Sequence, residues 1–332
     1  MSKNADTPPD EFALIAQIFA PLAAGDPGSF GLTDDAAIIS SRAGQDLVVT
    51  ADMMTAGVHF FADDAPDLIA RKLLRVNLSD LAAKGAKPHG YILTVALPVD
   101  TGMPWLRAFA EGLARDQAEF GINLLGGDTT AAQGPLCLSV TATGWVGQGG
   151  MLRRSGAQAG DDIYVSGTIG DAGLGLRVRR DGPLAGLSAE QNEFLLGRYL
   201  LPQPRNQLGV ALAGAAHACL DVSDGLAADL GHITGTSRVG AEIQLLDIPL
   251  SRAAKTALDL KLADITELIG AGDDYELLFT APPAQAQALR KIAAAANVAI
   301  CRIGRIIAGS GVVFLDQANA PVTLKKSGYR HF

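Results

Sequence analysis

Aspartates stand in five short clusters along the 332-residue chain, and each cluster adjoins apolar residues. The clusters are Asp34-Asp35, Asp52, Asn77 with Asp80, Gly126-Gly127-Asp128, and Asp221-Val222-Ser223-Asp224. Taken singly, each has an ordinary structural explanation, because aspartate favours turns and helix N-caps. Taken together, carboxylates whose backbones lie near a core would repel one another unless cations neutralised them. Because the clusters hold oxygen donors without histidine or cysteine, they favour Mg²⁺ over Zn²⁺.

Two or more Mg²⁺ ions held by such acids commonly clamp a nucleotide polyphosphate. The chain has no G-x-x-x-x-G-K-[ST] phosphate loop, and the glycine-rich segment 167–175 fits no dinucleotide fingerprint. Gly126-Gly127 would instead let backbone N–H groups approach a phosphate closely. The pair Arg153-Arg154 would add cationic support to phosphate oxygens, or would be an ordinary solvated linker.

Composition excludes several classes of protein. The formal charge is −8, from 27 basic and 35 acidic residues, which argues against binding a nucleic-acid backbone. A hydrophobic content of 48% argues against disorder. No apolar run reaches the roughly 20 residues of a membrane span, and the polar N-terminus lacks a signal-peptide pattern. The three separated cysteines, Cys137, Cys219 and Cys301, predict reduced thiols in a cytoplasmic protein.

Periodicity predicts alternating helices and strands in the first half, and these elements must position the acids. Helices are expected at 11–24, 66–83 and 104–120, and strands at 36–40, 47–51, 91–97, 122–125 and 136–146. On the second helix, Asn77 and Asp80 are three residues apart and share a face. The strand 122–125 is expected to end at Gly126-Gly127-Asp128.

A glycine-rich stretch at 147–160 predicts a crossover between two domains, 1–148 and 149–332. The second half is expected to contain a strand at 162–165, helices near 170–180, 189–200, 205–216 and 282–297, a strand into Asp221, and a helix from about Gly225. The predicted class is therefore mixed α+β with two domains.

In this order, these residues resemble the thiamine-monophosphate kinase family of the PurM-like ATP-binding superfamily. The matching blocks are DDAA (34–37), TADMMTAGVHF (50–60), VNLSDLAAKGAKP (76–88), GGDTT (126–130), RSGAQAGD (154–161), DVSDGLAADLGHI (221–233), GAGDDYEL (270–277) and Gly328-Tyr329. They run collinearly over nearly the whole chain, and several are too long to match by chance.

The resemblance implies ATP-dependent phosphorylation of thiamine monophosphate to thiamine diphosphate with several Mg²⁺ ions. It implies a PurM-like two-domain fold, with an N-terminal α/β domain whose sheet pairs with a second subunit and a C-terminal α/β domain. A cytoplasmic homodimer that binds neither nucleic acid nor membrane is therefore expected.

The resemblance also assigns roles to individual positions. The implied metal ligands are Asp35, Thr50, Ala51 through its backbone, Asp52, Asp80, Asp128, Asp221 and Asp224. Asp80 is implied to bridge more than one ion, and Asp80, Asp128 and Asp224 form the implied catalytic set. The implied ATP contacts are Gly127, Asp128, Arg154 and Ser223, and the implied thiamine contacts are His59, Asp273 and Tyr329.

Three positions depart from the family pattern. Thr33 stands where the family usually has glycine, and Ala51 stands where a hydroxyl residue is frequent. Asp273 stands where glutamate is frequent, so its contact to the thiamine moiety is expected to be longer or water-mediated. The accepting phosphate is itself an anionic nucleophile, so metals and alignment suffice without a strong base. His59 is more plausible as a substrate contact or a packed histidine than as a general base.

Three other functions would use some of the same residues. Another PurM-like ATP user, such as selenophosphate synthetase or aminoimidazole ribonucleotide synthetase, would share the fold. The former needs a reactive residue near the N-terminus, but residues 1–136 contain no cysteine. A non-catalytic Mg²⁺- or Ca²⁺-dependent nucleotide-binding protein would be expected to lose some of the acids. A metal-dependent phosphohydrolase usually has histidine ligands, and this chain has only five histidines.

Overall fold

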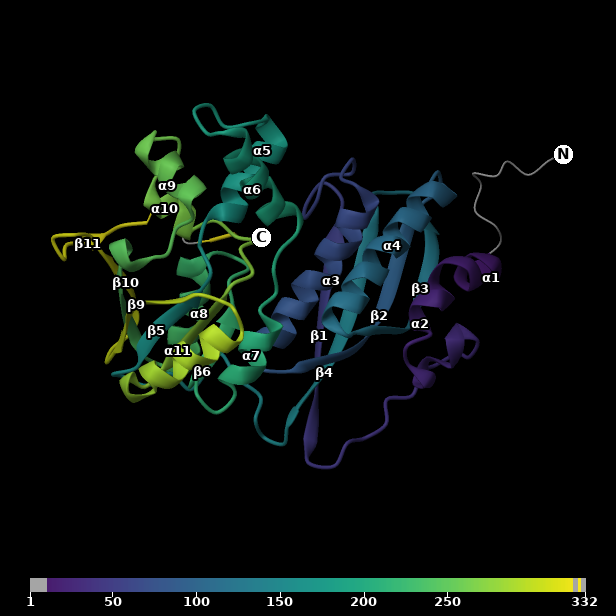
Figure 1. Ribbon diagram of the computed structural model, residues 1–332, viewed down its shortest axis with the longest axis horizontal. Coiled ribbons are helices and arrows are strands. Elements are labelled where there is room, and N and C mark those ends of the chain that lie inside the picture. Colours follow the sequence, from purple (N-terminus) through teal and green to yellow (C-terminus); the bar gives the residue numbers. More distant parts are fainter. Residues whose placement is uncertain (1–10, 325–327, 330–332) are drawn as a thin grey trace. The chain divides into compact units, whose positions relative to one another are not determined.

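The computed structural model describes residues 11–324 and 328–329, and the chain forms two compact units. One contains Met1–Leu81 and Lys87–Gly149, and the other contains Ala82–Ala86 and Gly150–Phe332. Each unit is built around its own β-sheet (Figure 1). The N-terminal stretch expected not to be a signal peptide lies, up to residue 10, outside the described residues. None of the described helices is long and apolar enough to cross a membrane.

The sheet of the first unit has four strands in the order β1-β4-β2-β3. These strands are β1 (Gln45–Thr55), β2 (Lys87–Pro98), β3 (Asn123–Ala132) and β4 (Cys137–Gly147). β4 pairs antiparallel with β1 and with β2, whereas β2 and β3 are parallel. A parallel pair needs a crossover, and helix α4 (Met103–Phe120) provides it between β2 and β3. β1 and β3 are therefore the two edge strands.

The two faces of this sheet differ in burial. Helices α3 (Pro66–Ala83) and α4 lie over one face (Figure 1). Because side chains alternate along a strand, Val48 and Met54 of β1 are buried on one face. Val49 and Met53 point the other way and are 57% and 62% exposed. The outer face of the sheet is thus an exposed surface with large apolar side chains.

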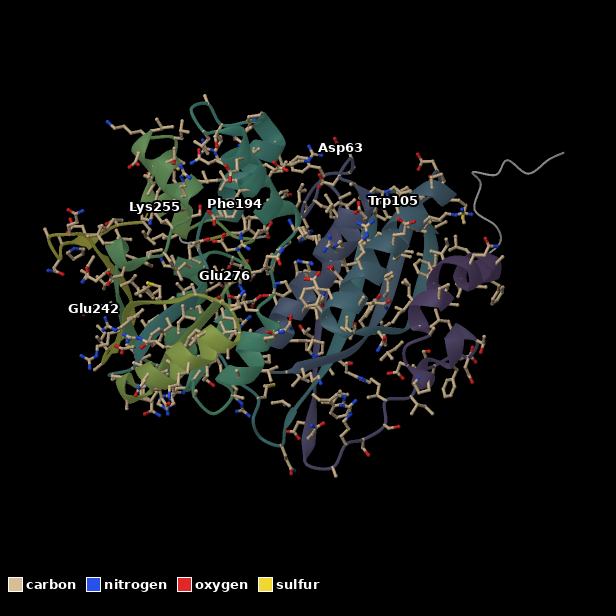
Figure 2. All side chains as sticks on the ribbon, viewed as in Figure 1. Asp63, Trp105, Phe194, Glu242, Lys255 and Glu276 are labelled. Carbon is tan, nitrogen blue, oxygen red and sulfur yellow. The ribbon has the colours of Figure 1, made fainter. Side chains whose placement is uncertain are left out.

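A buried ion-pair cluster fixes α3 against α4. The Arg75 guanidinium, 1% exposed, donates to both carboxylate oxygens of the fully buried Asp116 at 2.7 and 3.0 Å. Arg71 donates to the same carboxylate at 2.8 Å. On α4, Trp105 stacks on Phe109 with ring centroids 5.1 Å apart, and Figure 2 labels Trp105. The ion pairs of Arg71 and Arg75 with Asp116 hold α3, the helix that carries Asp80, against α4.

The N-terminal segment departs from the prediction. Residues 11–23 form three consecutive pieces, α1 (Glu11–Leu14), a π-helix η1 (Ile15–Phe19) and α2 (Ala20–Ala23), followed by the 3₁₀-helix η2 (Pro27–Leu32). The strand predicted at 36–40 is wrong. Ile38 donates its N–H to the Gly28 carbonyl oxygen at 2.9 Å, so this extended stretch bonds back to η2 and joins no sheet.

The segment Gly126-Gly127-Asp128 also differs from the prediction, because β3 continues through it. The pairing with β2 shifts by one residue at Leu125, which forms a bulge. A Cβ at position 127 would lie 1.9 Å from the Leu93 carbonyl oxygen, so only glycine permits the strands to pair here. The motif therefore lies within an edge strand and not in a loop.

The sheet of the second unit has seven strands in the order β11-β10-β7-β9-β5-β8-β6. These are β5 (Asp162–Ser166), β6 (Ala218–Asp221), β7 (Gly240–Gln244), β8 (Leu277–Ala281), β9 (Ile300–Ile307), β10 (Gly311–Leu315) and β11 (Pro321–Val322). Only β7 and β10 pair in parallel among these strands; the other pairs are antiparallel.

Helices surround this second sheet. They are α5 (Asp171–Asp181), α6 (Ala189–Leu200), α7 (Asn206–Leu212), α8 (Leu226–Ser237), α9 (Arg252–Asp259), α10 (Ile265–Ile269) and α11 (Ala286–Ala295), with 3₁₀ turns η3 (Leu245–Asp247) and η4 (Pro283–Gln285). The helices predicted near 170–180, 189–200 and from Gly225 are present as α5, α6 and α8. The helix predicted at 282–297 forms as η4 followed by α11.

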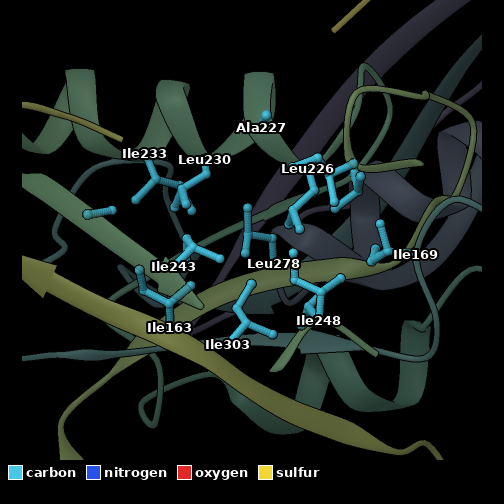
Figure 3. Close-up of a cluster of buried hydrophobic side chains, with 14 of the residues drawn as sticks. Ile163, Ile169, Leu226, Ala227, Leu230, Ile233, Ile243, Ile248, Leu278 and Ile303 are labelled. Atoms are coloured by element: carbon cyan, nitrogen blue, oxygen red, sulfur yellow. The ribbon is translucent and has the colours of Figure 1, made fainter. Parts of the chain in front are cut away.

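The core of the second unit packs α8 against the sheet (Figure 3). Leu226, Leu230 and Ile233 of α8 recur on one helix face and are fully buried. They contact strand residues that include Ile163 and Leu278. Because α8 starts directly after Asp221–Gly225, this packing fixes the acidic loop at the edge of the core.

Candidate active site

Three predicted metal ligands of the first unit lie together. Thr50 and Asp52 are two residues apart on β1, and the Thr50 hydroxyl donates a hydrogen bond to the Asp80 carboxylate of α3. Burial, reinforced by the neighbouring Asp80 carboxylate, raises the pKa of Asp52 to about 6. Two carboxylates and a hydroxyl thus converge where a strand passes a helix.

Asn77 supplies a further oxygen on α3. Its side chain is fully buried, and its Nδ2 donates to the Leu73 carbonyl oxygen at 2.9 Å. Among the described residues, no donor reaches its Oδ1. A buried oxygen without a donor is costly unless something positive satisfies it. Asn77 precedes Asp80 by three residues and shares its helix face, as the spacing predicted.

These residues fit a hard divalent cation. The donors are carboxylate, hydroxyl and amide oxygens, the set that Mg²⁺ prefers. Burial is the main cause of the raised pKa of Asp52, and a cation between Asp52 and Asp80 would offset both this cost and the repulsion from Asp80. The neighbouring carboxylates of Asp52 and Asp80 and the Asn77 oxygen without a donor are features of the structure itself.

A second acidic group lines a cavity at the β3 edge of the sheet. The cavity has a volume of about 840 Å³. Asp34, Asp35, Gly127 and Asp128 line it together with apolar side chains from the N-terminal helices and the sheet, including Ile15, Phe19, Leu93, Val95 and Leu124. The cavity therefore has both acidic and apolar parts.

The two acidic groups of the first unit are far apart in the sheet. Asp52 pairs with Val140 of β4, Val140 pairs with Leu93 of β2, and Leu93 pairs with Gly127 of β3. Three strand spacings separate the ends of this row, or about 14 Å along the sheet. Asp52 and Asp128 of one chain therefore cannot bind the same ion side by side.

His59 and Ala51 are also placed in the first unit. The His59 Nδ1 accepts the Thr55 backbone N–H at 3.1 Å, so the ring proton of the neutral histidine is on Nε2. Ala51 alternates with Thr50 and Asp52 along β1 and is exposed, so its side chain lies on the opposite face. The Ala51 side chain therefore points away from Thr50 and Asp52, and only its backbone could serve a site on their face.

In the second unit, two loops are held side by side. The backbone N–H groups of Asp273 and Tyr275 donate to the carbonyl oxygens of Ser223 and Val222 at 2.9 and 2.8 Å. A Cβ at position 272 would lie 2.4 Å from the Ser223 carbonyl oxygen, so glycine permits this close approach. The predicted ATP contact Ser223 and the predicted thiamine contact Asp273 are thereby neighbours.

The C-terminal Tyr329 joins the same group. Its N–H donates to the Asp224 carbonyl oxygen at 2.9 Å, and its side chain is 43% exposed. A Cβ at Gly328 would lie 2.8 Å from that carbonyl oxygen and 2.4 Å from the Ala228 Cβ. The glycine before the tyrosine therefore lets the chain reach Asp224.

Sequence reasoning missed two neighbours of Asp224. One ligand atom each from Asp224, Asp229 and His232 lies within 4.8 Å of the others. The Asp229 carboxylate accepts the N–H groups of Asp224 and Gly225 at 3.0 and 3.1 Å. Burial, followed by the charge of Asp224, raises the pKa of Asp229 to about 7. The three-residue spacing of Asp229 and His232 on a helix was the available signal.

The remaining predicted residues of the second unit are Asp221 and Arg154. Asp221 ends β6 and is buried, two residues before Ser223. Arg154 is exposed and follows Arg153, whose carbonyl oxygen accepts the Cys219 N–H at 2.8 Å. This bond places Arg154 beside β6, the strand that leads into the acidic loop.

Comparison with protein families and solved structures gives consistent results. The family AIR synthase related protein, N-terminal domain, matches residues 33–146, and the C-terminal domain of the same description matches residues 158–316. The Caulobacter vibrioides thiamine-monophosphate kinase is 46% identical over 330 residues, which cover 98% of this chain and 92% of that protein.

Two solved structures extend the comparison. The Stenotrophomonas maltophilia thiamine-monophosphate kinase is 44% identical with a TM-score of 0.80, and the match covers 92% of this chain and 96% of that one. AaThiL complexed with AMPPCP and TMP is 28% identical with a TM-score of 0.78, covering 92% and 97%. The predicted PurM-like two-domain α+β fold is confirmed. By sequence and by fold, the chain belongs to the thiamine-monophosphate kinase family.

Proposed function

We propose that this protein transfers the γ-phosphoryl group of ATP to thiamine monophosphate and forms thiamine diphosphate and ADP. The observation that carries the proposal is the convergence of Thr50, Asp52 and Asp80 at one point of the first unit. A structural role does not account for two neighbouring carboxylates, or for a buried amide oxygen without a donor three residues before one of them. The relative solved with AMPPCP and TMP supports the two substrates.

Mg²⁺ is the cation that these donors suit. Thr50, Asp52 and Asp80 would hold it in the first unit, and Asp221 and Asp224 would hold it in the second. Asp35, Asp128 and the Ala51 carbonyl complete the proposed ligand set. When bound, Mg²⁺ offsets the negative charge of the polyphosphate and of the acceptor phosphate, which otherwise repel each other.

The remaining residues bind and orient the two substrates. Gly127 lines the cavity of the first unit and is a proposed ATP contact there. Arg154 and Ser223 are the other proposed ATP contacts, and the guanidinium suits phosphate oxygens. His59, Asp273 and Tyr329 are the proposed thiamine contacts.

The chemical step follows from this arrangement. An oxygen of the thiamine monophosphate phosphate forms a bond to the γ-phosphorus while the bond from that phosphorus to the ADP oxygen breaks. The attacking oxygen is already anionic, so no side chain has to remove a proton from it. His59 is not placed to act as a base, because its Nδ1 accepts the Thr55 N–H and its Nε2 carries a proton and is therefore a donor. Alignment and charge compensation therefore carry the catalysis.

We also propose that the protein is a homodimer formed through the sheet of the first unit. The outer face exposes Leu47, Val49, Met53 and Ile92 at 38–62%, and a second copy would cover them. Within the described part of the chain, β1 and β3 are the edge strands of this sheet, and neither has a partner strand on its outer side. A two-fold arrangement that joins β1 of each copy to β3 of the other would bring Asp128 of one chain beside Asp52 of its partner.

Two further proposals concern organisation and location. The functional halves are 1–148, with the first sheet and its acids, and 149–332, with the second. A cytoplasmic location is supported by the three cysteines, which are unpaired. Complete burial raises the pKa of the Cys219 thiol to about 12, which suits an inert core residue in a reducing compartment.

The test is a mass-resolved assay of the purified protein with ATP, Mg²⁺ and thiamine monophosphate, and with free thiamine as a parallel acceptor. Thiamine diphosphate formed from the monophosphate alone is the expected result. Product from free thiamine, or no product despite Mg²⁺-dependent ATP binding, would overturn the proposed acceptor. If ATP binds without product, the next step is to test other phosphoryl acceptors that enzymes with this fold use.

A further inference from the structure

The loop that carries Asp273 has a strained backbone. Asp273 and Tyr275 have φ angles of 69° and 50°, in the left-handed region. Aspartate tolerates this conformation, but a bulky aromatic residue adopts it rarely. Such strain persists only where the surrounding structure enforces it, and it concentrates at functional sites. Hydrogen bonds of Asp274, Glu276 and Arg198 enforce it here.

Side chains along this loop alternate between two environments. Asp274 and Glu276 are 1% and 0% exposed, whereas Asp273 and Tyr275 are partly exposed. The Asp274 carboxylate accepts the N–H groups of Gly170 and Ala172 at 2.6 and 3.1 Å, at the start of α5. Asp274 therefore anchors the loop to the start of α5 on its inner side through these two hydrogen bonds.

Glu276 is the second inner anchor, and Figure 2 labels it. Its carboxylate accepts hydrogen bonds from Arg205 through both Nε and Nη2, and from the Ser166 hydroxyl at 2.6 Å. Arg198 of α6 adds a further donor at 2.9 Å. A buried carboxylate with this many partners is fixed in position.

Arg198 connects the two anchors. Its Nη2 donates to the Asp274 carbonyl oxygen at 3.1 Å and to the Glu276 Oε1 at 2.9 Å. The Arg198 guanidinium thus bonds to the residues on both sides of Tyr275, Asp274 and Glu276. Arg198 is 8% exposed, so water does not compete strongly for these bonds.

We propose that Arg198 is a positioning residue for the thiamine contact at Asp273, acting through the backbone of residues 274–276. The inference rests on the proposed function and extends it to a residue that does not touch substrate. With Arg198 in place, the Tyr275 hydroxyl reaches the Asp273 Oδ1 at 3.3 Å. The same conformation keeps the Asp273 N–H on the Ser223 carbonyl oxygen, next to Asp224. A relaxed loop would move the short aspartate side chain away from the substrate.

The sharpest variant is Arg198→Gln. Glu276 keeps Arg205 and Ser166 as partners, so no buried charge is left alone and the fold is expected to survive. Arg198→Lys keeps one cationic donor and is expected to restore part of the effect. The matched control is Arg177→Gln, because Arg177 also donates to a backbone carbonyl oxygen in this unit, that of Leu262 at 2.8 Å.

Two measurements test the proposal. For Arg198→Gln, KM for thiamine monophosphate is expected to rise about tenfold while KM for ATP changes less than about twofold. Hydrogen exchange followed by mass spectrometry is expected to show faster exchange of the amides of Asp273 and Tyr275, with β8 still protected. Arg177→Gln is expected to change neither quantity.

Equal increases in both KM values, or unchanged exchange at Asp273 and Tyr275, would overturn the positioning role. An Arg198→Lys variant as impaired as Arg198→Gln, with all of the second unit exchanging faster, would indicate a merely structural arginine and overturn it as well. If the unaltered chain does not phosphorylate thiamine monophosphate, the proposed function fails instead. The exchange experiment would then still decide whether Arg198 holds the loop.

Discussion

Asp52 and Asp128 lie on the two opposite edge strands of one four-stranded sheet, about 14 Å apart along it. Both are expected ligands of the same metal-bound polyphosphate, yet one chain keeps them apart. The sheet has an exposed apolar face, and β1 and β3 are its edge strands, so a second copy of the chain could bind here. A second copy that pairs edge to edge would supply the missing acid.

This arrangement predicts complementation between two inactive variants. Asp52→Asn and Asp128→Asn are each expected to lose activity, because every site lacks one acid. When the two variants are co-expressed, half of the dimers are hybrids in which one site has both native acids. The mixture is therefore expected to recover about a quarter of the native activity. The measurements are the turnover of the mixture and that of the hybrid isolated through two different affinity tags, which is expected to have about half of the native activity.

A double variant, Asp52→Asn with Asp128→Asn, co-expressed with the Asp52→Asn chain is the control. Both chains of this hybrid lack Asp52, so it has no complete site, whether the acids meet across the dimer or within one chain. Failure of the two single variants to complement, in a confirmed hybrid dimer, would mean that both acids act from the same chain.

Asp80→Asn is expected to lower turnover by at least about a hundredfold and leave the fold intact. Asp80 accepts the Thr50 hydroxyl and faces Asp52, so its loss removes a shared ligand without leaving a buried charge unpaired. Turnover and circular dichroism are compared with those of Asp67→Asn. Asp67 is on the same helix but pairs with the exposed Arg115 at 3.0 Å, so its variant is expected to remain active. Native turnover in a folded Asp80→Asn protein would exclude the proposed role.

The sequence predicted those parts of the fold whose signals are local. Periodicity located α3 and α4, and the spacing of Asn77 and Asp80 correctly put both on one helix face. The segment after Asp221 became α8 because its leucines and isoleucine recur at helical spacing. The acids alone did not distinguish between several metal-dependent functions. The family resemblance did, and the comparison with known proteins confirms the family.

Long-range contacts were beyond local signals. The stretch at 36–40 has strand composition, but its Ile38 N–H bonds to the Gly28 carbonyl oxygen of η2 and the stretch joins none of the described strands. Gly126-Gly127 resembled a turn, although the bulge at Leu125 and the close approach of Leu93 require glycine within a strand. Arg198 lies 76 residues from Asp274, and no pattern in the sequence links them.

His59 is expected to act as a hydrogen-bond donor through Nε2, and His59→Gln tests this. The glutamine amide can place an N–H near the Nε2 position, whereas His59→Asn places its oxygen only near the Nδ1 position that accepts the Thr55 N–H. His59→Gln is expected to stay within about tenfold of native activity, and His59→Asn to raise KM for thiamine monophosphate further. Equal loss of kcat in both variants would favour a general base instead.

Asp274 predicts a dependence of stability on pH. Burial raises its pKa from an ordinary value near 4 to about 8 in the folded protein. Between these values the folded state holds a proton that the unfolded state has lost, so this group's contribution to stability falls as pH rises. Asp274→Asn cannot ionise, so its Tm relative to that of the native protein is expected to rise from pH 5 to pH 8.

Thermal unfolding at several pH values measures this difference, with Asp181→Asn as the control. Asp181 is exposed beside Arg180, which holds the pKa of this carboxyl below its usual value. Its effect is therefore expected to be constant between pH 5 and pH 8. A constant Tm difference for Asp274→Asn over the same range would show that Asp274 has an ordinary pKa.

Tyr329→Ala is expected to raise KM for thiamine monophosphate more than KM for ATP. The Tyr329 N–H is bound to the Asp224 carbonyl oxygen, which any residue at this position would keep, and its ring is 43% exposed. Removing the ring therefore takes away a surface for the thiamine rings, by stacking or by a cation–π contact, without breaking the backbone bond. Tyr329→Phe retains the aromatic face and is expected to behave like the native protein. If Tyr329→Ala changes both KM values equally and lowers Tm, the tyrosine stabilises the fold and does not bind thiamine.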